Sequence, residues 1–281
     1  MKSYSVDKYD VDELYGNEYT DNAQERIEAL RDKSIIRYRV KTIKAGNMLE
    51  CEIYPIWNTR SALSRAPKKK ESRKEQRNLN RKNAVKHLVR LINANFEADR
   101  DIWVHLGYDD DHLPENAKEA SKEVQRYIRK LRTYARRKGW DELKYIYVTQ
   151  RGKTTKRIHH HLVINFPDRD IAEQLWHGGK YPRANRLRIG DPRFKFEGMA
   201  NYIGSDHDGT KSYVASRNLK QPTITVADAK FTRRRAERVL TGEIDPKQLF
   251  EKMYPGYTYT DIKAFTSDYV SGTYIYVRMR C

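Results

Sequence analysis

The sequence of 281 residues predicts an α+β fold in which helices pack against a central antiparallel sheet. Three patterns lead to this prediction: alternation of apolar and polar residues over 36–53, a helical apolar stripe over 116–137, and two further strand patterns within 143–165. Neighbouring strands joined by short turns form antiparallel hairpins, and an amphipathic helix needs such a sheet to cover its apolar stripe.

The first strand pattern predicts a hairpin. Apolar and cationic residues alternate strictly over 36–41, Ala45-Gly46-Asn47 is suited to a turn, and the alternation returns over 49–53. After Pro67 the apolar residues change to helical spacing and continue to Phe96. A basic region therefore leads into an amphipathic helix.

The middle of the chain carries the clearest elements. A short strand is expected at 102–106. Asn116 can cap a helix whose apolar stripe ends near Gly139. Strands are expected at 143–149 and 157–165, on either side of a polar turn.

These elements divide the chain into four segments. We expect an acidic N-terminal segment at 1–33, the hairpin and basic amphipathic helix at 34–97, a catalytic core at 98–220, and a C-terminal extension at 221–281 that completes the domain. The extension shows a basic helix around 232–240 and a final strand at 273–279.

The net charge of +18 indicates a polyanionic partner, most commonly a nucleic acid. The apolar runs are shorter than the roughly 18 residues of a membrane span, and the N-terminus lacks a signal-peptide pattern. Two cysteines give no disulfide framework, so we expect a reducing cytoplasm. The densest basic run is either a solvated helix face or a DNA contact, and its candidate DNA-binding residues are Arg65, Lys68, Lys69, Lys70, Arg73 and Lys74.

Three adjacent histidines lie within the strand at 157–165. Side chains alternate along a strand, so His159 and His161 share one face while His160 points to the opposite, apolar face. Two imidazoles so placed can bind one divalent cation; the alternative is that they only line the strand. If Gln150 pairs opposite Arg157 in the hairpin, its amide oxygen lies on the same face and becomes a candidate third ligand.

The histidine segment resembles the HUH endonucleases, in particular the rolling-circle replication-associated (Rep) proteins of phages, plasmids and integrative elements. The resemblance covers roughly residues 35 to 225 and depends on an ordered set of segments. They are Leu106–Pro114, Tyr147–Gly152, the histidine triplet, Trp176–Gly178 and Gly198–Ile203. It implies a ferredoxin-like variant of the α+β fold.

The resemblance also implies a reaction. A tyrosine beyond the histidines, matched here by Tyr202 with Tyr213 in reserve, would attack single-stranded DNA and form a 5′-phosphotyrosine with Mg²⁺ or Mn²⁺ bound. The substrate would carry a hairpin or origin sequence, and a separate helicase would open the duplex. The family often has a lysine just after the tyrosine; here that cationic role falls to Lys211 or Arg217, and Arg157 is a further candidate DNA contact.

Two other functions fit the same residues. A non-catalytic nucleic-acid-binding protein could use the same scaffold, with the histidines only stabilising the hairpin. A metal-dependent hydrolase could use water as its nucleophile, and it would cut DNA without becoming attached to it.

Overall fold

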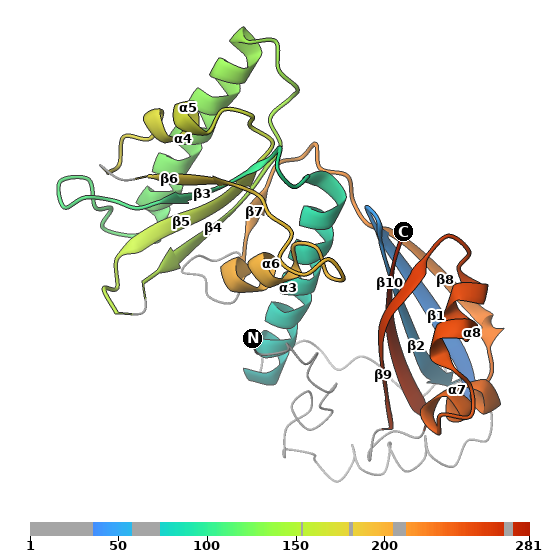
Figure 1. Cartoon of the computed structure of the whole chain (residues 1–281). Coiled ribbons are helices and arrows are strands. Elements are labelled where there is room, and N and C mark those ends of the chain that lie inside the picture. The colour runs from blue at the N-terminus through green and yellow to red at the C-terminus, as the bar shows by residue number, and fades with distance from the viewer. Residues whose placement is uncertain (1–35, 58–73, 153, 180–181, 205–211, 267–271) are drawn as a thin grey trace. The chain divides into compact units, whose positions relative to one another are not determined.

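The computed structural model describes residues 36–57, 74–152, 154–179, 182–204, 212–266 and 272–281 (Figure 1). The chain forms two compact units: one comprises residues up to Asn80 together with Thr223–Cys281, and the other is Arg81–Pro222. Each unit contains a five-stranded antiparallel sheet covered by helices, which confirms the predicted α+β class. The acidic segment at 1–33, the basic residues from Arg65 to Arg73, and Lys211 lie outside the described residues.

The first unit is built on the predicted hairpin. Strands β1 (Ile36–Ala45) and β2 (Met48–Trp57) pair through the turn at Gly46, where a positive φ of 61° suits glycine. The sheet order is β8-β1-β2-β10-β9. Its remaining elements are β8 (Thr223–Phe231), β9 (Thr258–Thr266), β10 (Thr273–Arg280) and the helices α7 (Arg233–Leu240) and α8 (Pro246–Met253).

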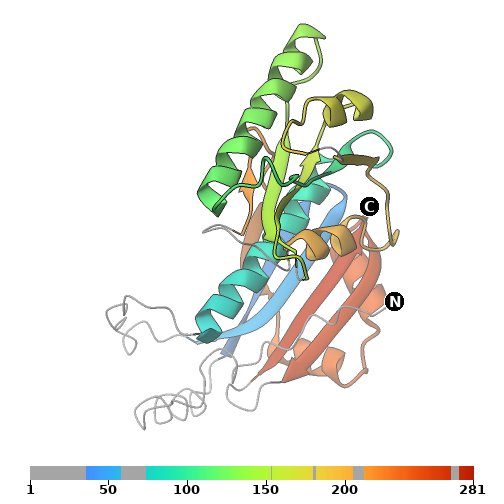
Figure 2. The ribbon, with the colours of Figure 1, turned by 90° about the vertical axis from the view of Figure 1, so that its left-hand side faces the viewer.

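The core of the first unit lies between its sheet and its two helices. Figures 1 and 2 show α7 and α8 on the same face of the sheet. From the helices, Ala236 and Phe250 are fully buried in this core, against alternate residues of the strands such as Leu49 and Val277. The period of two along each strand therefore places the apolar residues beneath the helices.

The second unit has the sheet order β6-β3-β5-β4-β7. Its strands are β3 (Ile102–Leu106), β4 (Tyr145–Arg151), β5 (Ile158–Ile164), β6 (Arg183–Arg186) and β7 (Val214–Ala215). Its helices are α3 (Lys74–Asn95), α4 (Ala117–Arg137), α5 (Arg169–Gln174) and α6 (Glu197–Gly204). The predicted cap is confirmed, because the Asn116 side chain accepts hydrogen bonds from two backbone N–H groups in the first turn of α4.

The sheet of the second unit has helices on both faces. Helices α4 and α5 bury the apolar stripe at Val124 and Leu131 against one face, and α3 and α6 cover part of the other (Figure 1). Trp103 and Val163 face α3 and α6, whereas the next residue of each strand faces α4. None of the described helices is long and apolar enough to span a membrane.

Helices α3 and α6 approach one another closely at a glycine. A Cβ atom added to Gly204 would lie 3.1 Å from side-chain atoms of both Val85 and Leu88 on α3. This separation is tighter than ordinary van der Waals contact, so a larger residue would require the neighbours to move. The C-terminal end of α6 is therefore packed directly onto α3.

Candidate metal centre

The central strand β5 presents its three histidines to opposite sides. His159 and His161 lie on the face towards α3 and α6, with ring centroids 5.0 Å apart. His160 is fully buried on the other face, where it hydrogen-bonds with the hydroxyls of Tyr108 (2.7 Å) and Thr149 (2.9 Å). The alternation along the strand is the one that the sequence predicts, and His160 is satisfied within the core.

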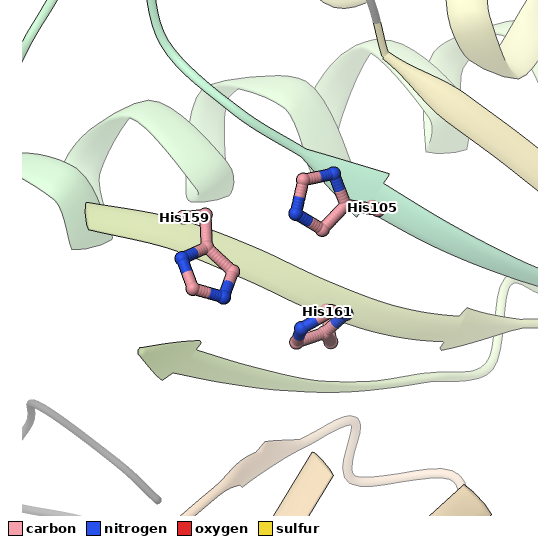
Figure 3. Close-up of side chains that lie close together, drawn as sticks. All are labelled: His105, His159 and His161. Carbon is pink, nitrogen blue, oxygen red and sulfur yellow. The ribbon is translucent and has the colours of Figure 1, made fainter. Parts of the chain in front are cut away.

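A third histidine joins the pair from the neighbouring strand. His105 of β3 pairs directly opposite His161 of β5. One ligand nitrogen from each of His105, His159 and His161 lies within 4.8 Å of the other two. Figure 3 shows the three rings gathered above β3 and β5. The sequence analysis missed His105, and the only signal for it was a polar residue inside the apolar strand at 102–106.

Burial keeps these imidazoles in the neutral form that can bind a metal. It lowers the pKa of His161 to about 3, with a further contribution from the neighbouring histidines. Burial also lowers the pKa of His105, and that of His159 despite an opposing backbone hydrogen bond. His159 Nδ1 lies 3.4 Å from the Arg157 carbonyl, which can only accept, so Nε2 carries the free lone pair.

The His161 ring has two buried nitrogens, and neither has a hydrogen-bond partner among the described residues. Its side chain is only 2% exposed, so water does not replace the missing partner. An unsatisfied buried polar group is costly, and a cation held at the ring would remove part of that cost. The three histidines therefore fit a divalent metal ion.

The position of Gln150 corrects the predicted register. Gln150 pairs with His159, not with Arg157, which is a shift of two residues. A shift of two keeps the side chain on the same face, so Gln150 still lies beside the histidines. It is buried, and its Nε2 donates a 2.9 Å hydrogen bond to the Ile203 carbonyl in the last turn of α6. Gln150 thus ties the helix that carries Tyr202 to the strand beside the histidines.

This hydrogen bond predicts the effect of a substitution. In Gln150→Leu the buried Ile203 carbonyl loses its donor, so the free energy of unfolding should fall by about 1–3 kcal/mol in urea denaturation. The matched control is Gln125→Leu, which alters an exposed glutamine on α4 and should change stability by less than about 0.5 kcal/mol. Mn²⁺ titration separates two roles: a Gln150 that only anchors α6 leaves the affinity nearly unchanged, whereas a ligand oxygen from Gln150 requires a large loss.

Tyr202 projects from α6 next to the histidines. Its ring lies 5.6 Å from the His161 ring and 6.4 Å from the Trp103 ring, and its side chain is 58% exposed. Trp103 in turn stacks on His161 at 5.5 Å. The phenol is therefore close to the histidines and open to a large substrate.

Tyr213, the reserve nucleophile, has a different environment. Its hydroxyl hydrogen-bonds with His87 Nδ1, and burial raises its pKa. A raised pKa disfavours the phenolate that attacks phosphorus. No ring contact joins Tyr213 to the three histidines in the described part of the chain, so the structure favours Tyr202.

The predicted DNA contacts that the structure describes are few. Arg157 donates hydrogen bonds to the Asp110 carboxylate and to the Tyr108 carbonyl, so it holds the segment after β3. Arg217 is exposed. Lys74 begins α3, and its side chain lies outside the described set.

Two of the segments that carry the family resemblance contact one another. The indole N–H of Trp176 donates to the Gly107 carbonyl at 2.9 Å, and the Asp109 N–H donates to the Gly178 carbonyl at 3.1 Å. A Cβ atom at Gly179 would lie 2.8 Å from the Gly107 oxygen, so glycine is needed for this approach. Both segments are therefore packed beside the end of β3, just beyond His105.

Three imidazoles converging on an antiparallel sheet, with an exposed phenol beside them, form a metal site suited to phosphodiester chemistry. Residues 101–207 match a family model of replication-associated proteins, the ORF2 type. The matched region contains the three histidines and Tyr202, and the match is consistent with a Rep-type protein. No curated protein and no solved structure matches the chain.

Proposed function

We propose that the chain nicks and rejoins single-stranded DNA by forming a covalent 5′-phosphotyrosine. The observation that carries this proposal is the juxtaposition of Tyr202 with a three-histidine cluster, at 5.6 Å between the rings of Tyr202 and His161. The match to a replication-associated family and the net charge of +18 support a DNA substrate.

In this reaction the Tyr202 oxygen attacks the scissile phosphorus in line with the 3′ oxygen. The new bond joins Tyr202 Oη to phosphorus, the bond from phosphorus to the 3′ oxygen breaks, and the leaving oxygen takes a proton and becomes a 3′ hydroxyl. The phenol proton passes to solvent. Because one phosphoester replaces another, the 3′ hydroxyl can reverse the step and rejoin the strand without ATP.

His105, His159 and His161 would hold a divalent cation. That cation would supply Lewis-acid polarisation of the scissile phosphate, whose negative charge otherwise repels a nucleophile. Neutral imidazoles suit first-row transition metals, whereas Mg²⁺ takes oxygen ligands. The all-nitrogen set therefore favours Mn²⁺ over Mg²⁺ as the working ion.

Covalency tests the proposal. The full chain is incubated with Mn²⁺ and a library of hairpin-bearing single-stranded oligonucleotides with randomised flanks, labelled at either end, and resolved on a denaturing gel. A 5′-phosphotyrosine predicts that only the 3′-end label stays with the protein, that EDTA prevents this, and that the released fragment can be extended by a polymerase. Intact mass then gives the size of the attached DNA.

The two competing functions give other results. A water-using hydrolase leaves nicked DNA and an unmodified protein mass. A non-catalytic binding protein retains intact oligonucleotide on a native gel and releases all of it on the denaturing gel. Either result would rule out the tyrosine-linked reaction.

A further inference from the structure

The histidine row on the sheet continues into an arginine. In the second unit, His105 of β3 pairs with His161 of β5 on one side and with Arg183 of β6 on the other. Residues directly opposite in antiparallel strands share a face, with Cβ atoms about 5 Å apart. Arg183, His105 and His161 therefore lie side by side across three strands, with Arg183 at the edge.

The guanidinium of Arg183 is available for a ligand. Its side chain is exposed, and it makes no hydrogen bond or ion pair with the residues that the structure describes. Arg186, three residues later in the same strand, differs because it donates to the carbonyls of Arg100 and Pro167 at 2.6 Å each. Arg157 is likewise bound to Asp110.

Space above the row is also available. The strand β3 ends one residue after His105, and Gly107 follows without a side chain, so a Cβ atom there would meet only His105 Cε1 at 3.9 Å. The described part of the chain places no carboxylate in the metal cluster. An anion at the three histidines would therefore meet a guanidinium and not an acidic group.

We propose that Arg183 binds the phosphate that is presented to the three histidines and neutralises its charge as Tyr202 attacks. This inference rests on the proposed nicking reaction and adds a catalytic residue to it. Arginine suits the role because its planar fork donates two parallel hydrogen bonds to a phosphate and stays protonated at every working pH. It also takes the cationic role that the sequence analysis gave to Lys211 or Arg217.

The test compares Arg183→Gln with Arg129→Gln, which removes the same charge from an exposed site on α4, over the opposite face of the sheet. Single-turnover adduct formation at saturating DNA should slow by about 100-fold in Arg183→Gln, as when one charge-stabilising donor is removed, and stay unchanged in Arg129→Gln. Arg183→Lys should recover part of the rate, since it keeps the charge and loses the fork. Mn²⁺ affinity should be the same in all four proteins.

A second measurement separates this inference from the proposed reaction. Binding of a short single strand is measured in EDTA at several salt concentrations, and loss of one phosphate contact should reduce the slope of log affinity against log salt by about 0.7. If the unmodified chain forms no adduct but Arg183→Gln still shows this reduction, the nicking reaction is wrong and the phosphate contact stands. An unchanged rate and slope in Arg183→Gln, or a loss of Mn²⁺ affinity, would overturn the inference.

Discussion

His105→Gln is expected to abolish Mn²⁺ binding and, with it, formation of the protein–DNA adduct. His105 supplies one of three nitrogens that lie within 4.8 Å of one another, and the two that remain come from a single strand. Loss of residues that only support a ligand typically weakens metal binding about 10- to 100-fold, so loss of a ligand itself should exceed about 100-fold. Isothermal titration with Mn²⁺ measures this change directly.

The control for this substitution is His112→Gln, since His112 is an exposed histidine bonded to Asp109. It should bind Mn²⁺ as the unmodified chain does. Because His105 is half-buried, circular dichroism and thermal unfolding are needed to show that His105→Gln is folded. A folded His105→Gln protein with unchanged affinity would mean that His105 is not a ligand.

Tyr202→Phe is expected to reduce covalent attachment by about 10⁴-fold or more, the scale seen when an enzyme loses its nucleophile. The substitution removes one exposed hydroxyl and leaves the ring beside His161, so Mn²⁺ affinity and single-strand binding should be kept. The measurement is the fraction of protein carrying 3′-labelled DNA on a denaturing gel, supported by intact mass.

Tyr213→Phe is the matched comparison for Tyr202→Phe. The Tyr213 hydroxyl is hydrogen-bonded to His87, so its loss should affect local stability more than the reaction. Adduct formation should therefore persist in Tyr213→Phe. The reverse pattern, with attachment lost only in Tyr213→Phe, would assign the nucleophile to Tyr213 and exclude Tyr202.

Local patterns in the sequence were enough for the elements themselves. The hairpin at 36–53 and the helix capped by Asn116 are specified by alternation, turn residues and a capping side chain, all of which act within a few residues. The facing of His159 and His161 follows from the same period of two. These features need no knowledge of distant parts of the chain.

Long-range pairing is what the sequence did not reveal. Tyr38 pairs with Phe231 and Ile53 with Ile275, so the strands divide between two sheets through contacts between distant segments. His105 was missed for the same reason, since its place beside His161 depends on how β3 pairs with β5. For Gln150 the face was predicted correctly and the register was wrong by two residues, because a slip of two leaves the face unchanged.

The close packing at Gly204 has a consequence for where the reactive hydroxyl sits. Tyr202 is two residues earlier on the same short helix, so any outward shift of that helix from Val85 and Leu88 would carry the phenol with it. The reach of the nucleophile is thus calibrated by the smallest residue in the chain, at a point with no chemical role of its own. A single methyl group at that position would be felt as a change of aim.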